Sequence, residues 1–459
     1  MNRAREDQDT IVAISTPIGR GAVGIVRISG DDSKGILERT IPGLKGKIRK
    51  KRTLFGWVED PVNRKRIDKA VVLFFKGPES YTGEDVVEIH GHGGRKNIKR
   101  ILEVVIKNGA RMAEPGEFTF RAFMNGKMDL CEAEAVAEII DAKSRKACDI
   151  AVAHLSGVLG DRIGTLMDGL KKILVELEVS MDFPEEELEL ARVEIQVEQL
   201  QTIKKDLEKL LESYRKGKLF KEGYKVGIAG KTNVGKSSLL NVLLGRNRAI
   251  VDEKPGTTRD FLEETLELDG VLIRIIDTAG WRRNSEEIEK AGQEMAKRVL
   301  KKADMIICLA DASTGVDEED MEVWNIFSEN PKIAVWNKVD LVEENRIDKK
   351  EPWGENGMMI SAKERTGIDG LEREIVKRLT EEDEGTEESL IITEERQKEC
   401  FEKAKAAVEN VLRGFDQGAP GEVLAIDLRE SMAEIGKIMG KNLDEEIIEE
   451  IFSRFCIGK

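Results

Sequence analysis

Residues 230–237 read G-K-T-N-V-G-K-S and fit the phosphate-binding pattern G-x-x-x-x-G-K-[ST]. The apolar run from Tyr224 to Ala229 predicts a strand before the loop, and the leucine-rich run from Ser238 to Leu244 predicts a helix after it. In that setting the two glycines let backbone N–H groups surround a polyphosphate, Lys236 neutralises its outer oxygens, and Ser237 holds Mg²⁺. The sequence therefore predicts a nucleoside triphosphate site at the positive end of a helix, with contacts from Gly230, Asn233, Val234, Gly235, Lys236, Ser237 and Ser238.

Two later motifs decide which nucleotide binds. Asn337, Lys338 and Asp340 form N-K-x-D after an apolar run. The carboxylate of Asp340 can accept hydrogen bonds from N1–H and the 2-amino group of guanine, which adenine lacks, so a buried acceptor pair would reject ATP. The expected second loop at the base consists of Ser361, Ala362 and Lys363. The ordered set of motifs predicts a GTPase.

The segments between these motifs are expected to act at the γ-phosphate. The strand candidate 271–276 ends in D-T-A-G, so we expect Mg²⁺ and phosphate contacts from Asp277, Thr278, Ala279 and Gly280. Residues 255–260 read as a mobile switch that includes Thr257, and Thr258 would complete the Mg²⁺ shell. Trp281 stands where small signalling GTPases carry a water-orienting glutamine, so another orienting group and another positive charge are needed. The candidates are Arg259, Arg282, Arg283, Glu286, Glu287 and Glu289.

The composition is that of a globular protein, with 40% hydrophobic and 35% charged residues, and 459 residues predict about three domains. Residues 1–125 hold 24 lysines and arginines against 16 acidic residues, although the net charge of the whole chain is −14. Basic clusters at 45–52 and 95–100 either contact a polyanion or are solvated loops. A charged N-terminus and the lack of a long apolar run predict a cytosolic protein without membrane contact. Five scattered cysteines predict free thiols.

Changes in sequence pattern predict a multidomain α/β and α+β protein. Strand candidates at 10–15, 23–28, 70–75 and 86–89 indicate an α+β domain, and helical spacing runs from 129 to about 213 with one break at 182–184. The middle of the chain alternates strand and helix patterns, as a doubly wound domain does. Helical spacing of apolar residues resumes after the acidic run at residues 381–385. The predicted domains are 1–125, 126–222, 223–382 and 383–459, with the GTPase domain inserted between two parts of one helical domain.

Two smaller features leave alternatives open. His90 and His92 lie beside Glu88 and are either metal ligands or turn-forming residues, and the latter is favoured because a third ligand at metal spacing is missing. Cys456 is either a nucleophile near a flexible end or a packed thiol. The packed thiol is favoured because Cys456 continues one apolar stripe formed by Ile447, Ile448, Ile451, Phe452 and Phe455.

The chain resembles, from end to end, the MnmE (TrmE) tRNA modification GTPases. The stretches that carry the resemblance are Y-T-G-E-D at 81–85, H-G-H-G-G at 90–94, N-G-K-M-D-L at 125–130 and F-S-R-F-C-I-G-K at 452–459. The resemblance implies a folate-binding, dimerising N-terminal domain, a helical domain and an inserted GTPase domain. It also implies a homodimer that joins FAD-dependent MnmG (GidA) in a heterotetramer or larger assembly. That assembly would install a carboxymethylaminomethyl-type group at C5 of the wobble uridine of certain tRNAs. The GTPase motifs alone fit equally an RNA-binding or ribosome-assembly switch without group transfer.

The resemblance also assigns residues. The one-carbon donor, 5-formyl- or 5,10-methylene-tetrahydrofolate, is expected to contact Arg27, Glu88, Lys127 and Lys459. In place of an arginine finger, K⁺ is expected at the phosphates, held by Asn233 and by the backbone of a loop that includes Asp252, Lys254 and Thr257. Glu289 is similar to the family's water-orienting glutamate. This chain departs from the family pattern at D-E-K, residues 252–254, and at Trp281, where Leu or Ile is usual.

Overall fold

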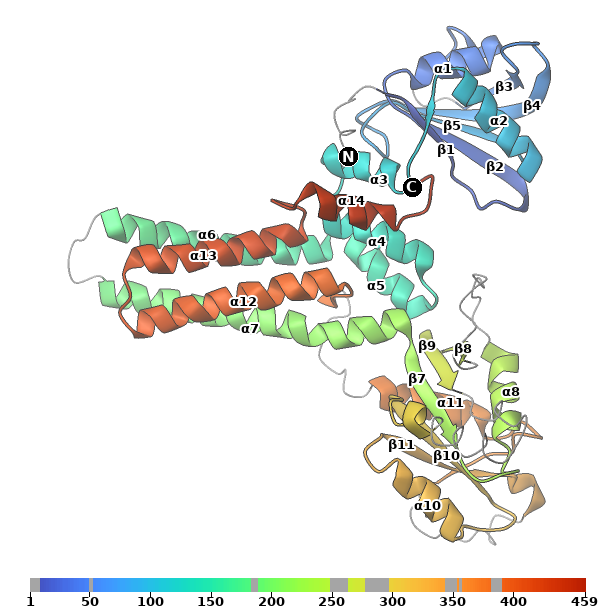
Figure 1. Cartoon of the computed structure of the whole chain (residues 1–459), viewed down its shortest axis with the longest axis vertical. Coiled ribbons are helices and arrows are strands. Elements are labelled where there is room, and N and C mark those ends of the chain that lie inside the picture. The colour runs from blue at the N-terminus through green and yellow to red at the C-terminus, as the bar shows by residue number, and fades with distance from the viewer. Residues whose placement is uncertain are drawn as a thin grey trace. The chain divides into compact units, whose positions relative to one another are not determined.

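The computed structural model describes residues 9–48, 53–182, 189–247, 263–276, 297–342, 353–354, 357–380 and 390–459. Contacts divide the chain into two compact units, and Figure 1 labels most of their helices and strands. Unit 1 comprises 1–137, 154–181 and 421–459, and unit 2 comprises 138–153 and 182–420. The four predicted domain ranges stay a prediction. Within the described ranges, no helix is long and apolar enough to span a bilayer.

A six-stranded sheet forms the N-terminal part of unit 1, in the order β3-β4-β5-β2-β1-β6. Neighbouring strands are antiparallel except β1 and β6, which are parallel. The strands are β1 (Ile11–Ile14), β2 (Arg20–Ser29), β3 (Leu54–Glu59), β4 (Arg66–Phe75), β5 (Val86–Gly94) and β6 (Arg111–Met112). The four predicted strands are β1, β2, β4 and β5, whereas β3 and β6, at the two edges, were not predicted.

Alternation along the central strands decides which side chains face the helices. On β2, Val26 and Ile28 are fully buried in a core that also contains side chains of both covering helices. Because successive side chains of a strand point to opposite faces, Arg27 points to the other face of the sheet. Glu88 is its register partner on β5. The covering helices are α1 (Ser33–Thr40) and α2 (Arg95–Lys107).

The C-terminal part of unit 1 packs on the N-terminal part through aromatic side chains. The Phe452 ring lies 5.4 Å from that of Phe120 in a T-shaped arrangement, and beyond Phe452 the chain forms a bridge between Ile457 and Pro115. The other helical segments of unit 1 are joined by an ion pair between Glu178 and Arg429. The helices are α3 (Glu117–Met124), α4 (Leu130–Asp141), α6 (Val158–Asp182), α13 (Gly421–Ile438) and α14 (Glu445–Ser453), of which α4 and α6 end in unit 2.

Cys456 is exposed, so the predicted packed thiol is wrong. The prediction extended the helical spacing of the apolar stripe up to Cys456, but α14 ends at Ser453. Beyond that point the chain leaves the helix, so Phe455 stays buried while Cys456 turns to solvent. Ile447, on the same predicted stripe, is 38% exposed.

Unit 2 contains a second six-stranded sheet, in the order β12-β11-β10-β7-β9-β8. It is parallel except for the antiparallel pair β8 and β9. All residues of the central strand β10 are buried, as expected for a parallel strand covered on both faces. The strands are β7 (Tyr224–Ala229), β8 (Glu263–Leu268), β9 (Val271–Ile276), β10 (Met305–Asp311), β11 (Lys332–Asn337) and β12 (Met358–Met359). β8 was not predicted.

Helices lie against both faces of this sheet. One core cluster includes Leu239, Leu243 and Ile375, and another surrounds Trp336 and Trp353. These two cores confirm the doubly wound α/β character. The helices are α8 (Lys236–Asn247), α10 (Glu318–Ile326) and α11 (Ile368–Thr380).

The helical part of unit 2 leads directly into its sheet. A single residue, Gly223 with φ +91°, connects α7 to β7. After the sheet the chain comes back to α7, where the Ile392 N–H donates to Ser213 Oγ at 3.1 Å. The prediction of one break in the helical region is wrong, because residues 142–144 and 156–157 interrupt it, the latter at Gly157 with φ +88°. Residues 183 and 184 of the predicted break lie outside the described residues. The helices are α5 (Arg145–Leu155), whose last residues belong to unit 1, α7 (Glu189–Glu222) and α12 (Glu395–Asp416).

Candidate functional sites

The phosphate loop is shaped by glycines that no other residue could replace. Gly230 has φ +149° and Gly235 has φ +103°, and a Cβ on Gly235 would lie 2.2 Å from Nδ2 of Asn337. The Lys236 ammonium donates to the carbonyls of Gly230 at 2.7 Å and Lys231 at 2.5 Å. Because α8 begins at Lys236, its first N–H groups face the same space. These features are the ones expected of a phosphate-binding loop, and the individual phosphate contacts stay a prediction.

Asn337 ties the phosphate loop to the predicted base loop. Its side chain is 2% exposed, and Nδ2 donates to the Val234 carbonyl at 2.8 Å. Its Oδ1 accepts from the Ala362 N–H at 3.0 Å. One buried amide thus fixes the spacing between the segment that would hold the phosphates and the segment that would hold the base.

The base-recognising groups lie beside this amide. Ser361 Oγ donates to Asp340 Oδ1 at 2.5 Å, which orients the carboxylate. Lys338 has φ +65° and donates to Asp311 Oδ2 at 2.6 Å. Burial raises the pKa of Asp311, but hydrogen bonds from Lys338 and Ser313 outweigh it, and the net pKa is lowered. Asp311 was missed by sequence reasoning, although its place at the carboxyl end of a parallel strand was a signal.

Only some of the remaining residues predicted at this site are among the described residues. The exposed side chains of Asn233, Ser237 and Ser238 lie in the loop and at the start of α8, and Lys363 is exposed beside Glu364. Asn233 adopts φ +62°. The other predicted phosphate, metal and catalytic residues lie outside the described residues: Asp252, Lys254, Thr257, Thr258, Arg259, Asp277, Thr278, Ala279, Gly280 and Glu289.

A second polar cluster lies on the sheet of unit 1, on the face opposite its helices. Arg27 Nε and Nη2 each lie 3.0 Å from Glu88 Oε1, and both side chains are about 15% exposed. The other carboxylate oxygen of Glu88 lies 3.0 Å from His90 Nε2. The predicted pair is therefore brought together, with His90 as a third member.

Aromatic rings and the C-terminal residues enclose this cluster. The Arg27 guanidinium lies 5.5 Å from the ring centroid of Tyr81 and 5.8 Å from that of Phe118. Its Nη1 donates to the Gly458 carbonyl at 3.4 Å. Burial and the charge of Arg27 lower the pKa of the neighbouring Lys459. The positive charges of Arg27 and Lys459 at this point would attract an anion.

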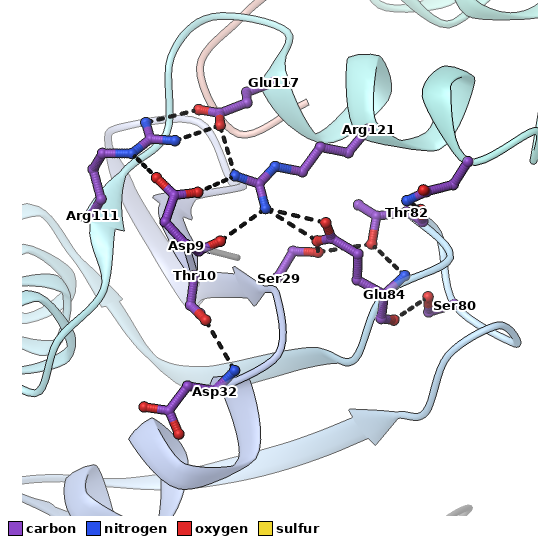
Figure 2. A network of polar contacts seen from close by, with 11 residues as sticks. Asp9, Thr10, Ser29, Asp32, Ser80, Thr82, Glu84, Arg111, Glu117 and Arg121 are labelled. Atoms are coloured by element: carbon purple, nitrogen blue, oxygen red, sulfur yellow. Dashed lines mark hydrogen bonds and ion pairs between the residues drawn. The ribbon is translucent and has the colours of Figure 1, made fainter. Parts of the chain in front are cut away.

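Figure 2 shows the polar network that holds the loop carrying Tyr81. Ser29 Oγ on β2 lies 2.7 Å from Thr82 Oγ1 and donates to Glu84 Oε2 at 2.6 Å. Arg121 Nη1 donates to Glu84 Oε1 at 3.1 Å and to the Asp9 carbonyl at 3.0 Å. The loop is thereby fixed to the sheet and to α3 just after Tyr81, through Thr82 and Glu84.

Lys127 is not brought into contact with the other three predicted folate residues. Its Nζ donates to the Pro78 carbonyl at 3.0 Å, so it contacts the loop that carries Tyr81, but at a point away from the ion pair. Sequence reasoning missed the two rings, Tyr81 and Phe118, as covers of Arg27. Tyr81 begins the stretch Y-T-G-E-D at 81–85, which carries the family resemblance. An aromatic residue in that stretch could have indicated a ligand contact.

His92, the other histidine of the pair, contacts a different carboxylate from His90. Its Nδ1 lies 2.7 Å from Asp68 Oδ1, while Asn97 Nδ2 donates to Asp68 Oδ2 at 2.6 Å. Burial raises the pKa of Asp68, but these hydrogen bonds outweigh it and lower the pKa overall. No group of three or more metal-ligating side chains occurs among the described residues.

Comparisons with known proteins cover almost the whole chain. A family model described as "GTP-binding protein TrmE N-terminus" matches residues 10–127, and one described as "MnmE helical domain" matches residues 130–456. A tRNA modification GTPase MnmE of Thermoanaerobacter pseudethanolicus is 43% identical over 460 residues, covering 98% of this chain and 99% of that protein. Proteins of the same name are 40% identical in Carboxydothermus hydrogenoformans and Thermotoga petrophila, each over 98% of this chain and 100% of the relative.

Among solved structures, Era of Aquifex aeolicus bound to GDP and AlF4⁻ is 30% identical over a region covering 40% of this chain and 66% of that chain, with a TM-score of 0.29.

Proposed function

The chain belongs to the family of MnmE tRNA modification GTPases, and from that premise we propose the reaction it serves. Together with an FAD-dependent flavoprotein partner, MnmG (GidA), it uses GTP hydrolysis to install a carboxymethylaminomethyl-type group at C5 of the wobble uridine of certain tRNAs. A reduced folate, 5-formyl- or 5,10-methylene-tetrahydrofolate, supplies the one-carbon unit. The protein acts in the cytosol as a homodimer within a larger assembly with the flavoprotein.

One observation carries the folate part of this proposal. Arg27 and Glu88 form an ion pair, the rings of Tyr81 and Phe118 lie beside the Arg27 guanidinium, and the Gly458 carbonyl, 431 positions after Arg27, accepts a hydrogen bond from it. A carboxylate such as Glu88 can accept from the N–H edge of a pterin, the rings of Tyr81 and Phe118 can lie against its plane, and Lys459 suits the anionic glutamate tail. The chemistry of these residues fits a flat, hydrogen-bonding, anionic ligand.

The GTP-hydrolysing part is supported by the phosphate loop and the base loop. Lys236 and Ser237 are suited to the phosphates and Mg²⁺, and Asp340 is suited to guanine. We place K⁺ at Asn233, where its positive charge would balance the charge that develops on the phosphates. Glu289 orients the attacking water when GTPase domains of two protomers meet.

The proposal is tested by folate binding to the purified protein. Wild type should bind 5-formyltetrahydrofolate in calorimetry, and Glu88→Ala should weaken binding at least about tenfold, which corresponds to about 1.4 kcal/mol. Glu103→Ala is the matched control, because this exposed glutamate on α2 has no part in the cluster. If the wild type fails to bind, the folate part is wrong, and the alternative of an RNA-binding switch is favoured. A positive result is extended by reconstituting tRNA modification with the flavoprotein.

A further inference from the structure

The second residue of the phosphate loop is anchored to a neighbouring helix. Lys231 occupies a position where the loop pattern accepts any residue, yet its side chain is only 13% exposed. Its ammonium lies 2.6 Å from Asp317 Oδ2 and 2.8 Å from Asp320 Oδ2. Both carboxylates belong to the start of α10, so the loop and this helix are joined by one cation.

The anchoring carboxylates are themselves held in place. Asp317 Oδ1 accepts from the N–H groups of Glu319 at 3.0 Å and Asp320 at 3.2 Å, while Asp320 Oδ2 accepts from the Asp317 N–H at 3.2 Å. This reciprocal cap fixes both acids on the first turn of α10. Asp320 is 1% exposed, and its Oδ1 has no hydrogen-bond partner among the described residues. Lys231 is therefore the only cation paired with this buried carboxylate in the part of the chain that the structure describes.

The backbone of Lys231 also contacts the phosphate-binding Lys236. The carbonyl of Lys231 accepts from the Lys236 ammonium at 2.5 Å, and the carbonyl of Gly230 accepts at 2.7 Å. These two carbonyls direct the ammonium that neutralises the phosphates. A shift of the Lys231 side chain would displace its carbonyl and thereby the Lys236 head group.

We propose that Lys231 is a positioning residue for GTP binding, which holds the phosphate loop in its binding shape by pairing with Asp317 and Asp320 of α10. Without the anchor the loop samples other shapes, and the nucleotide must select the competent one, which weakens its apparent affinity. The coupling is reciprocal, so bound nucleotide in turn steadies the first turn of α10.

The test compares variants of the full chain. Lys231→Met keeps much of the stem but removes the charge, and we expect GDP and GTP to bind about tenfold more weakly, within the range usual for coupled sites. Lys231→Arg should stay within about threefold of wild type, because a guanidinium can pair with both carboxylates. Glu319→Gln is the matched control, since it removes a carboxylate from the same helical turn without contact to Lys231. Affinity is measured with a fluorescent guanine nucleotide, and folding of each variant is checked by thermal unfolding without nucleotide.

Hydrogen exchange separates positioning from a merely structural role. In wild type, GDP should slow exchange of the Glu319 and Asp320 amides, and in Lys231→Met this response should be lost. Should Lys231→Met fail to fold, Asp317→Asn serves instead, because asparagine also caps helices but lacks the charge that pairs with Lys231. Unchanged GDP affinity in a folded charge-removing variant overturns the proposal. It is equally overturned if Lys231→Met and Asp317→Asn weaken binding independently, so that the double variant shows the product of the two effects.

Discussion

Replacing Asn337 with alanine should destabilise unit 2 and disconnect its two nucleotide loops. The side chain is 2% exposed and makes two hydrogen bonds, to the Val234 carbonyl at 2.8 Å and from the Ala362 N–H at 3.0 Å. Truncation leaves two buried backbone groups without partners, each of which costs about 1–3 kcal/mol. The sum of about 2–6 kcal/mol is reduced where water enters the space, so we expect a loss of about 3 kcal/mol. That is a large share of the about 5–15 kcal/mol by which domains are usually stable.

The assay is urea unfolding without nucleotide, followed by tryptophan fluorescence. Trp336 and Trp353 are almost fully buried in unit 2 and report its unfolding. In parallel, GDP affinity should fall by about 100-fold, equivalent to about 2.8 kcal/mol, because the phosphate and base loops lose their common tie.

Asn330→Ala is the matched control for this prediction. Its amide donates to the carbonyls of Lys301 at 3.1 Å and Ala303 at 2.9 Å, nearer the surface, where water can replace it. We expect this variant to lose less than about 1 kcal/mol. The reasoning is refuted if Asn337→Ala is no less stable than Asn330→Ala, or if the two bind GDP equally well.

Four further outcomes are expected. Asp340→Asn presents a donor where the carboxylate accepted, so preference should shift from guanine toward xanthine nucleotides; undiminished GDP binding in a competition assay would contradict the assigned role. Glu289→Ala should keep guanine nucleotide affinity but lose most single-turnover hydrolysis, and an unchanged rate removes it from the mechanism. Replacing K⁺ by Na⁺ should slow hydrolysis in wild type but make no difference in Asn233→Ala, as steady-state rates in both salts will tell. For Glu117, burial raises the pKa, but hydrogen bonds led by that from Arg111 bring it below its ordinary 4.5. Its stabilising contribution is present above that value and is lost as the pH falls through the lower folded pKa, so Glu117→Gln should flatten the acid limb of a stability–pH profile.

The sequence predicted the interior strands better than the edge strands. β7 and β9 were predicted to the residue, because parallel strands buried on both faces read as continuous apolar runs. β3 and β8 lie at sheet edges, and their sequences, L-F-G-W-V-E and E-E-T-L-E-L, mix apolar and charged residues because only part of each strand is covered. Helix boundaries that are set by single turn residues, such as Gly157, do not change the apolar spacing enough to be predicted from it.

The candidate sites were predictable where local spacing defines them. The phosphate loop and the N-K-x-D motif are short enough for the pattern to fix both residue types and shape. Arg27 and Glu88 came only from family resemblance, because their meeting depends on the register of two strands. The pairing of Lys231 with Asp320 depends on how a helix packs beside the loop, and no spacing rule predicts it. The error at Cys456 arose from extending a helical period past the true helix end.

The contact between Arg27 and the Gly458 carbonyl sets an order of events during synthesis. The two residues are 431 positions apart, so at about 5–20 residues per second the ribosome adds Gly458 roughly 20–90 s after Arg27. Throughout that interval the sheet that carries Arg27 can form, but the Phe118 N–H still lacks its later acceptor, the carbonyl of Lys459. A nascent chain therefore contains its complete phosphate loop, residues 230–237, well before its other polar cluster can be closed.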